Sequence, residues 1–176
     1  IADMVGVELK IEPRKRYTFV FDCAEDLGRD VPLTIDPSGV HVRSDGDAYM
    51  AGCTPDIDPA VAYDDYEIDQ DIFEDKVWPA LVNRIPAFER IKIQTQWAGH
   101  YAHNDFDHNV IVGPHGDVAN FVLANGFSGH GVQQSPAIGR GVSELITYGE
   151  YRTLDLTSLG HARIVDGEPF IESAII

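Results

Sequence analysis

Short runs of alternating apolar and polar residues, separated by turn signals, limit the fold of this chain most strongly. Every second residue is apolar or β-branched from Ile91 to Trp97. A period of two places one set of side chains on one face of a strand, as in a half-buried antiparallel sheet. Further strand-like runs occupy residues 7–11, 17–21, 40–43, 49–52, 110–112 and 121–124. We therefore predict an antiparallel sheet whose strands are joined by short turns.

Helical spacing appears in two segments. Their apolar positions are Phe73, Val77, Leu81 and Ile85 in the first, and Ile138, Val142, Leu145 and Ile146 in the second. Pro79 lies inside the first segment and predicts a kink or two short helices. In the second, we expect Ser135 to cap the helix, Pro136 to take its first position and Gly149 to end it. Short strands with few helices favour the α+β class.

Charge excludes several classes of function. The chain of 176 residues has 29 acidic and 13 basic side chains, which gives a formal net charge of −16. Such a polyanion repels nucleic-acid backbones and anionic membrane surfaces, and the short basic run at residues 14–16 is flanked by Glu12 and Tyr17. No apolar run approaches the ~18 residues of a membrane span, and no signal peptide is evident. We predict neither nucleic-acid binding nor a membrane span.

The two cysteines, Cys23 and Cys53, stand apart without a CxxC motif or a histidine at zinc spacing. Reduced, buried thiols explain them better than a disulfide does. This usage favours an intracellular compartment, which we expect to be the cytoplasm, or the mitochondrial matrix if the protein is eukaryotic.

A glycine-rich segment, residues 126–136, carries the strongest functional signal. It reads Gly-Phe-Ser-Gly-His-Gly-Val-Gln-Gln-Ser-Pro and leads directly into the second helical segment. Glycines let the backbone approach a ligand closely, and free N–H groups at a helix N-terminus favour an anion or a carbonyl that gains negative charge. The alternative is a purely structural glycine turn, and the two interpretations have about equal weight for such a loop.

The chain resembles the FAD-dependent oxidoreductases of the D-amino-acid-oxidase-like family, which includes glycine and sarcosine oxidases and dimethylglycine dehydrogenase. The resemblance spans nearly the whole chain. It is carried by residues 121–146, by Trp97-Ala98-Gly99, by residues 107–113, by Glu12 to Arg16 and by residues 155–176. The last of these is similar to the chain end of the FAD-dependent oxidoreductase domain-containing branch.

The resemblance implies a division by role. Residues 1–113 would form the antiparallel sheet of a substrate domain, with flanking helices. Residues 114–150 would form a flavin-contacting hairpin, glycine-rich loop and helix that belong to the FAD domain, and residues 151–176 a C-terminal tail. The resemblance places Gly129, His130, Gly131, Val132 and Gln133 against the flavin, and we expect Gly131 to touch it or to take a positive φ. His130 as a packed core histidine remains an alternative.

Three departures from the family pattern matter. No GxGxxG occurs, and Gly126, Gly129 and Gly131 follow no βαβ unit, so we expect the N-terminal dinucleotide-binding half to be missing and this chain to be a fragment. Residues 49–52 lack the lysine that sarcosine oxidases use to activate oxygen, which favours a dehydrogenase. His100 and its neighbours replace a flavin-linking cysteine, which implies that FAD is bound non-covalently.

Three histidines and two aspartates between His100 and His108 suggest a metal site, but their spacing matches no standard motif, so we expect no metal. We instead expect Tyr101 and Asn104 to face the substrate, with a structural hairpin loop as the alternative. The sequence identifies no catalytic residue.

Three functions stay open on the sequence. The first is oxidation of the C–N bond of an amine or amino acid, of the sarcosine, dimethylglycine or D-amino-acid type, by hydride transfer to flavin. The second is a non-catalytic assembly factor or binding platform with a flavoprotein fold, and the third is an independent ligand-binding module. Uncovered apolar surface also predicts that the isolated chain associates into homo-oligomers.

The missing GxGxxG motif generates a direct prediction. Pyrophosphate contacts supply much of the affinity for a dinucleotide, so residues 1–176 alone should not retain FAD. Gel filtration after incubation with FAD checks this, and a yellow protein with stoichiometric flavin would contradict it.

Overall fold

The computed structural model describes residues 1–118 and 120–173. The chain divides into two compact units, one of residues 14–100 and the other of residues 1–13 together with the chain from Tyr101 onward. Residue 119 of the expected segment 114–150 and residues 174–176 of the expected tail lie outside the described residues. The expected division by role at residues 113 and 150 stays a prediction.

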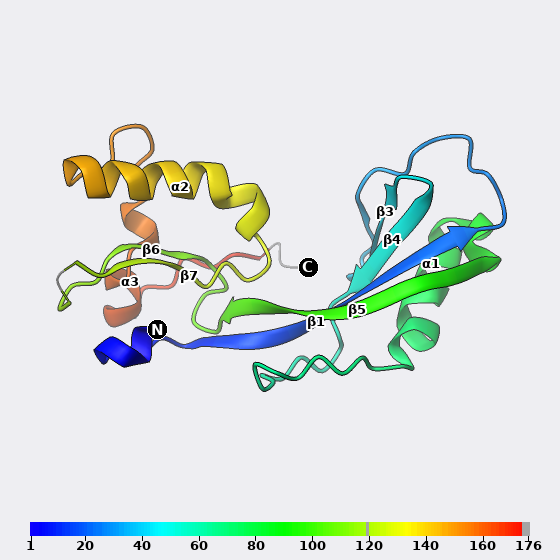
Figure 1. The fold of residues 1–176 in the computed structure, drawn as a ribbon, viewed down its shortest axis with the longest axis horizontal. Helices are drawn as coiled ribbons and strands as arrows, with labels where there is room; N and C mark the ends of the chain where they lie inside the picture. Colours follow the sequence, from blue (N-terminus) through cyan, green and yellow to red (C-terminus); the bar gives the residue numbers. More distant parts are fainter. Residues whose placement is uncertain (119, 174–176) are drawn as a thin grey trace. The chain divides into compact units, whose positions relative to one another are not determined.

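The main sheet has five strands in the order β2-β3-β4-β1-β5 (Figure 1). The strands are β1 (Ile11–Cys23), β2 (Thr34–Ile35), β3 (His41–Asp45), β4 (Ala48–Cys53) and β5 (Ile91–Asn104). Pairing of β2 with β3, of β3 with β4 and of β4 with β1 is antiparallel, which confirms the predicted meander. The strand expected at residues 17–21 lies within β1, whereas the strand expected at residues 7–11 is wrong except at Ile11, where β1 begins.

The core of the unit formed by residues 14–100 lies on one face of this sheet. Tyr17, Phe19 and Phe21 alternate along β1, and all three side chains are buried. The ring of Phe21 meets that of Phe88 edge-on at 5.2 Å, and the ring of Phe19 lies 4.8 Å from that of Phe73. These contacts attach the helical segment to the sheet through aromatic packing. Cys53 is buried in the same core and is a free thiol, as is the partly exposed Cys23.

The first helical segment is divided as Pro79 predicts. A π-helical turn, η2 (Phe73–Val77), passes into α1 (Trp78–Arg84), which is followed by the 3-10 turn η3 (Pro86–Glu89). Pro79 lies in the first turn of α1, directly after the π-helical turn η2.

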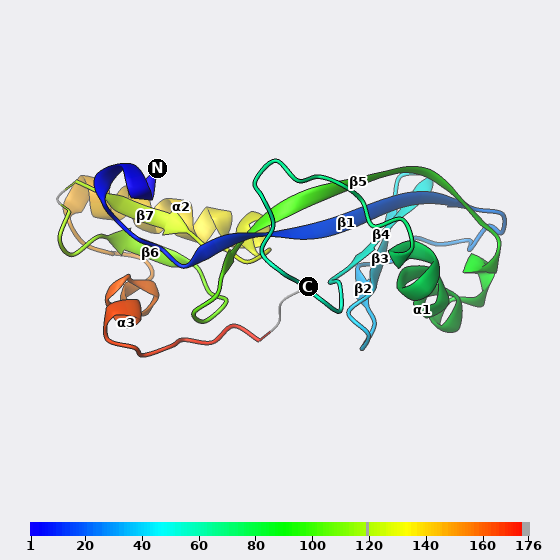
Figure 2. The same ribbon diagram turned by 90° about the horizontal axis from the view of Figure 1, so that it is seen from below.

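The other unit contains a two-stranded antiparallel ribbon and the longest helix. Its elements are η1 (Ala2–Val5), β6 (Ile111–Pro114), β7 (Val122–Asn125), α2 (Gly131–Tyr148), η4 (Thr157–Leu159) and α3 (Ala162–Val165) (Figure 2). The ribbon confirms the predicted hairpin. Val110, Val112, Ile138 and Leu156 form the core of this unit. Among the described residues, no helix is long and apolar enough to cross a membrane.

Helix α2 begins five residues earlier than the sequence predicts. His130 is its N-cap, Gly131 its first residue, and Pro136 lies inside it. A proline inside a helix leaves the carbonyl four residues before it without a backbone donor. The hydroxyl of Ser135 donates to that carbonyl, on Val132, at 2.8 Å. Ser135 therefore compensates for Pro136 rather than capping the helix.

The far end of α2 agrees better with the prediction. Gly149 ends the helix with a φ of 78° and donates its N–H to the carbonyl of Leu145. The expected apolar stripe is wrong at Ile146, which is 71% exposed, and Glu144 is buried in its place. The Glu144 carboxylate accepts hydrogen bonds from the backbone of Arg152 and Thr153 at 2.8 and 3.0 Å, so it fixes the chain that leaves the helix.

These contacts generate a prediction on pH. The Thr153 hydroxyl, followed by the two backbone amides, lowers the pKa of Glu144 from 4.5 to about 2. A lowered pKa stabilises the fold fully above the unfolded pKa and loses that effect as the pH falls through the folded one. Glu144→Gln should therefore lower the urea midpoint near pH 7, and the difference from wild type should shrink between about pH 4.5 and 2. The exposed Glu150→Gln is the control, and a pH-independent difference for Glu144→Gln would contradict the assignment.

Candidate functional site

The glycine-rich loop between β7 and α2 has a backbone that depends on glycine at two positions. Gly126 has a φ of 74° and Gly129 a φ of 97°, and between them Ser128 has a φ of 48°. L-residues rarely adopt these values. The expectation of a positive φ at Gly131 is wrong, because Gly131 is the first residue of α2. A Cβ atom there would meet Phe127 at an ordinary 3.5 Å.

Ser128 fixes the loop to the end of β5. Its side chain is fully buried, and its Oγ accepts a hydrogen bond from the backbone N–H of Asn104 at 3.0 Å. Its own N–H donates to the carbonyl of Ala102 at 3.1 Å. These two hydrogen bonds, one accepted by the side chain and one donated by the backbone, explain how the left-handed conformation of Ser128 is maintained.

Both positive-φ glycines also permit close contacts. A Cβ atom on Gly126 would lie 2.5 Å from the side chain of Ile11, and one on Gly129 would lie 2.5 Å from the ring of Tyr101. Real side chains do not approach so closely. The Tyr101 ring therefore packs directly on the loop backbone, and any side chain at position 129 would displace one of them.

Tyr101 and Asn104, the residues expected to face a substrate, stand near the end of β5. Tyr101 is partly exposed and touches the loop at Gly129, one of the expected flavin-contacting residues. Asn104 is 1% exposed, and its amide donates to Asp107 at 2.9 Å and to the carbonyl of Asn109 at 2.6 Å. These bonds occupy the Asn104 side chain inside the protein, so we retain Tyr101 alone as the candidate for substrate contact.

The N-terminus of α2 presents backbone amides. No side chain caps it, and its first turn holds no acidic residue. The first N–H groups of a helix have no partner within it, and here they belong to Gly131, Val132 and Gln133. Val132 is 88% exposed, so this turn faces outward. Together with the helix dipole, these amides favour an anion or a carbonyl oxygen that gains negative charge.

The histidine-rich run is divided between the two compact units. His100 lies in the unit of residues 14–100, where its ring stacks on Tyr66 at 4.3 Å. The rings of His103 and His108 lie 4.9 Å apart, tilted by 41°, in the other unit. Asp107 forms an ion pair with Arg163. Within residues 1–118 and 120–173, no three His, Cys, Asp or Glu side chains are grouped so that they could hold a metal ion.

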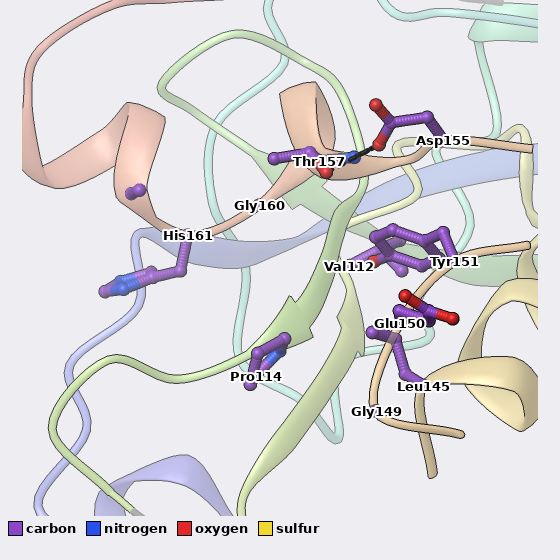
Figure 3. Close-up of a pocket in the computed structure, with 11 residues that line it drawn as sticks. Val112, Pro114, Leu145, Gly149, Glu150, Tyr151, Asp155, Thr157, Gly160 and His161 are labelled. Atoms are coloured by element: carbon purple, nitrogen blue, oxygen red, sulfur yellow. Dashed lines mark hydrogen bonds between the residues drawn. The ribbon is translucent and has the colours of Figure 1, made fainter. Parts of the chain in front are cut away.

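A separate cavity of about 530 Å³ lies beside the C-terminal end of α2 (Figure 3). Val112, Leu145 and Tyr151 provide apolar surface, and Asp155 is bonded to Thr157 at its rim. Burial raises the pKa of Tyr151 and, together with His115 and Arg163, lowers that of His161. None of the residues expected to contact flavin or substrate lines this cavity.

The Asp107–Arg163 pair is the part of the site region that sequence reasoning missed. The two residues are 56 positions apart, and no spacing rule connects them. An aspartate in the turn after β5 and an arginine in a short helix each look like ordinary surface charges. A buried pair of this kind becomes visible only when the fold brings the two segments together.

Comparison with known proteins points in one direction. Residues 1–145 match the family described as DAO, FAD dependent oxidoreductase. The chain is 45% identical to "FAD-dependent oxidoreductase domain-containing protein 1" of Xenopus laevis over 97% of its length, and 42% identical to the Drosophila melanogaster homolog over 96%. It covers 35% and 33% of those proteins, so it spans about a third of the curated relatives.

Solved structures agree on the fold. L-proline dehydrogenase from P. horikoshii superposes with a TM-score of 0.84 at 27% identity, over 96% of this chain and 45% of that one. Glycine oxidase from Geobacillus kaustophilus superposes with a TM-score of 0.70 at 19% identity, over 90% of this chain and 41% of that one. The second likeness concerns the fold alone. Both structures support the mixed α and β class with an antiparallel sheet.

The loop geometry generates a paired prediction. Gly129→Ala should lower the free energy of unfolding by ~1–3 kcal/mol, because the backbone is left-handed there and the new methyl group meets Tyr101. Gly131→Ala, two residues on, should be neutral or stabilise by up to ~1 kcal/mol, because alanine suits a helix. Urea unfolding of the complete protein measures both. Equal effects of the two substitutions would show that the loop conformation is not specific to glycine.

Proposed function

This chain belongs to the DAO family of FAD-dependent oxidoreductases, and we propose that it contributes the substrate-facing sheet and the flavin-contacting loop of an enzyme that oxidises C–N bonds. The substrate class is an amine or an amino acid. The observation that supports the proposal most directly is the uncapped N-terminus of α2, held by a glycine-rich loop against Tyr101.

The residues present fit a flavin. A planar ring needs a flat wall without side chains, and the backbone from Gly129 to Gln133 offers glycine at two of its five positions. The first-turn amides of α2 would hold the carbonyl-bearing edge of the ring system. A side chain at Gly129 would displace Tyr101 or the loop backbone, since a Cβ atom there would fall 2.5 Å from the Tyr101 ring. We therefore assign Gly129, His130, Gly131, Val132 and Gln133 to non-covalent FAD binding.

The chemistry follows from charge. Bound flavin supplies a two-electron acceptor, which oxidation of a C–N bond requires. The first-turn amides and the helix dipole stabilise negative charge at the edge they face, and they do so without reorganising. No acidic side chain in that turn opposes this effect. The loop thus favours the reduced state of a flavin bound beside it.

The proposed specificity for amines rests on the aromatic ring of Tyr101 and on the family. Tyr101 would pack against the substrate on the side away from Gly129, with its ring restrained by the loop. L-proline dehydrogenase, a structural neighbour at 27% identity, is named for an amino acid whose nitrogen is a secondary amine. A small amino acid or secondary amine is therefore the substrate class that we propose for this chain.

The pyrophosphate and adenine of FAD need a second set of contacts. The GxGxxG motif that would supply them does not occur in residues 1–176, and the curated relatives are about three times as long as the matched region. We propose that a dinucleotide-binding segment of the same protein completes the site. Such an arrangement makes that segment the principal partner of this chain.

Anaerobic reduction of the complete protein tests the function. We expect the purified protein to carry FAD, and proline, sarcosine or dimethylglycine to bleach its visible absorption. Tyr101→Ala should raise the KM for the amine at least about tenfold if the Tyr101 ring contacts the substrate, since an apolar contact of this kind contributes ~1–3 kcal/mol. Retained FAD with no bleaching by any amine would favour the non-catalytic binding platform instead.

A further inference from the structure

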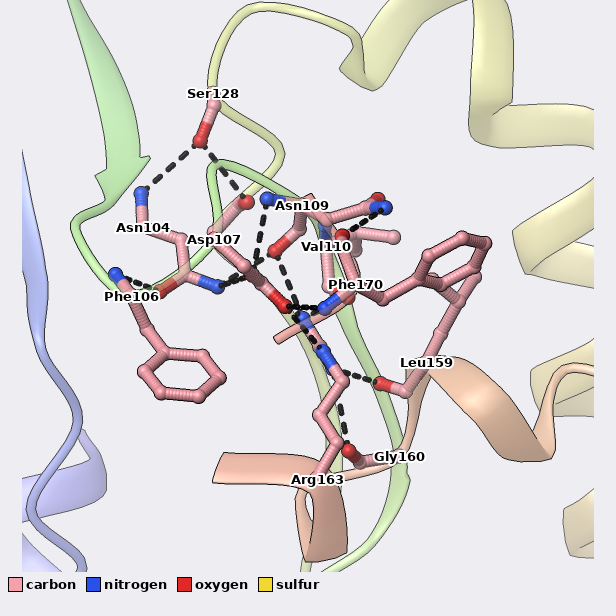
Figure 4. A network of polar contacts seen from close by, with 11 residues as sticks. Asn104, Phe106, Asp107, Asn109, Val110, Ser128, Leu159, Gly160, Arg163 and Phe170 are labelled. Atoms are coloured by element: carbon pink, nitrogen blue, oxygen red, sulfur yellow. Dashed lines mark hydrogen bonds and ion pairs between the residues drawn. The ribbon is translucent and has the colours of Figure 1, made fainter. Parts of the chain in front are cut away.

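The carboxylate of Asp107 is the centre of a buried polar network (Figure 4). Its side chain is fully buried and faces the guanidinium of Arg163, with distances of 2.6 Å from Nε to Oδ2 and 3.0 Å from Nη2 to Oδ1. The amide of Asn104 and the backbone N–H groups of Asn109 and Phe170 donate to the same carboxylate. Five hydrogen bonds from four residues converge on this one group.

These bonds keep Asp107 charged. Burial alone would raise its pKa, but hydrogen bonds from Arg163, Phe170 and Asn109 outweigh burial and hold the pKa below its usual range. The carboxylate is therefore ionised at neutral pH, and it retains its partners as an anion. A charged hydrogen bond is stronger and more directional than a neutral one, so the network has a defined geometry.

Arg163 connects this centre to the C-terminal segment. It is 7% exposed, and it also donates to the carbonyls of Leu159 and Gly160, which precede it. On the other side it donates to the carbonyls of Asn109 and Val110, at the start of β6. Phe170 and Glu172 add backbone N–H bonds to the carboxylate and the carbonyl of Asp107. Hydrogen bonds to Arg163 and Asp107 thus hold the segment from residue 159 to residue 172 in place.

Asn104 connects the same centre to the glycine-rich loop. Its side chain donates to Asp107, while its backbone N–H donates to the Oγ of Ser128. Its Cβ also lies 3.2 Å from the position that a Cβ on Gly126 would take. Asn104 therefore touches the loop at two points while its amide is held by the Asp107 carboxylate.

We propose that Arg163 is a positioning residue for the glycine-rich loop, acting through Asp107 and Asn104, so that the C-terminal segment sets the geometry of the flavin-contacting site. The route is continuous: Arg163 orients the carboxylate, the carboxylate orients Asn104, and Asn104 holds Ser128 in its left-handed conformation. This inference rests on the proposed function for its ligand, but the mechanical link can be measured without any ligand.

The chain offers a matched control. Arg16 forms the same kind of two-pronged pair with Asp58, at 2.8 and 2.9 Å, and it is 8% exposed. That pair lies in the unit of residues 14–100, whereas the loop belongs to the other unit. Lysine at either position keeps the positive charge but cannot donate two parallel hydrogen bonds. Arg163→Lys and Arg16→Lys therefore each remove a two-pronged pair with a buried or partly buried carboxylate.

The complete protein serves for all measurements. Arg163→Lys should weaken FAD binding about tenfold and shift the flavin absorption band, as expected when a packed network modulates a distant site. It should also speed hydrogen exchange of the amides of residues 127–131, with and without FAD. Arg16→Lys should lower the melting temperature but leave the FAD affinity within about twofold of wild type, because separate sites do not couple.

Asn104→Ala is the second variant, because it removes the amide that joins Asn104 to Asp107 while leaving the Arg163–Asp107 pair and the backbone N–H of Asn104 in place. It should reproduce the loss of FAD affinity, and adding Arg163→Lys to it should cause little further loss, since both act on one route. If Arg163→Lys does not fold, this variant and its exchange rates still decide the matter.

Two outcomes separate this inference from the proposed function. Unchanged FAD affinity, spectrum and loop exchange in Arg163→Lys or in Asn104→Ala, with a wild-type protein that binds FAD, would overturn the positioning role alone. A wild-type protein that binds no FAD would overturn the proposed function. Faster exchange at residues 127–131 in the variants would then still support the link, and unchanged exchange would overturn it.

Discussion

The arrangement of the glycine-rich loop depends on the buried ion pair between Asp107 and Arg163. A buried charge is costly unless it is paired and its remaining lone pairs are satisfied, and removing one partner costs far more than the pair contributes. Here the satisfying donors come from the end of β5, the start of β6 and the C-terminal segment. Because one buried carboxylate needs hydrogen-bond donors, three stretches of chain that are separated in the sequence lie together around it.

The site built on this frame uses backbone more than side chains. Amides at the start of α2 supply the positive potential, and Gly126 and Gly129 let the loop backbone pack closely against Ile11 and Tyr101. The chain has a formal net charge of −16, and a basic side chain at the site could form ion pairs with nearby acidic residues. Backbone amides carry no net charge, so they can face a ligand without forming such ion pairs. The identity of the side chains at Val132 and Gln133 matters less than the conformation that exposes their N–H groups.

Most of the fold was predictable from local pattern. Alternation from Ile91 to Trp97 and the strand-like runs at residues 40–43 and 49–52 predicted strands that the structure confirms, because these signals arise from neighbouring residues. The errors occurred where a distant contact outweighed the local preference. Ser135 looked like a helix cap beside Pro136, yet the helix extends to Gly131, where the loop attached to β5 fixes its start.

The sequence by itself determined the family, the antiparallel sheet and the position of the glycine-rich loop, since each depends on residue types at short spacing. The tertiary structure decided which glycines are conformationally essential, namely Gly126 and Gly129 rather than Gly131. It also decided that Asn104 is committed to the interior, through Asp107 and Arg163. These outcomes depend on φ angles and on contacts across 56 residues, and local composition contains no information on either.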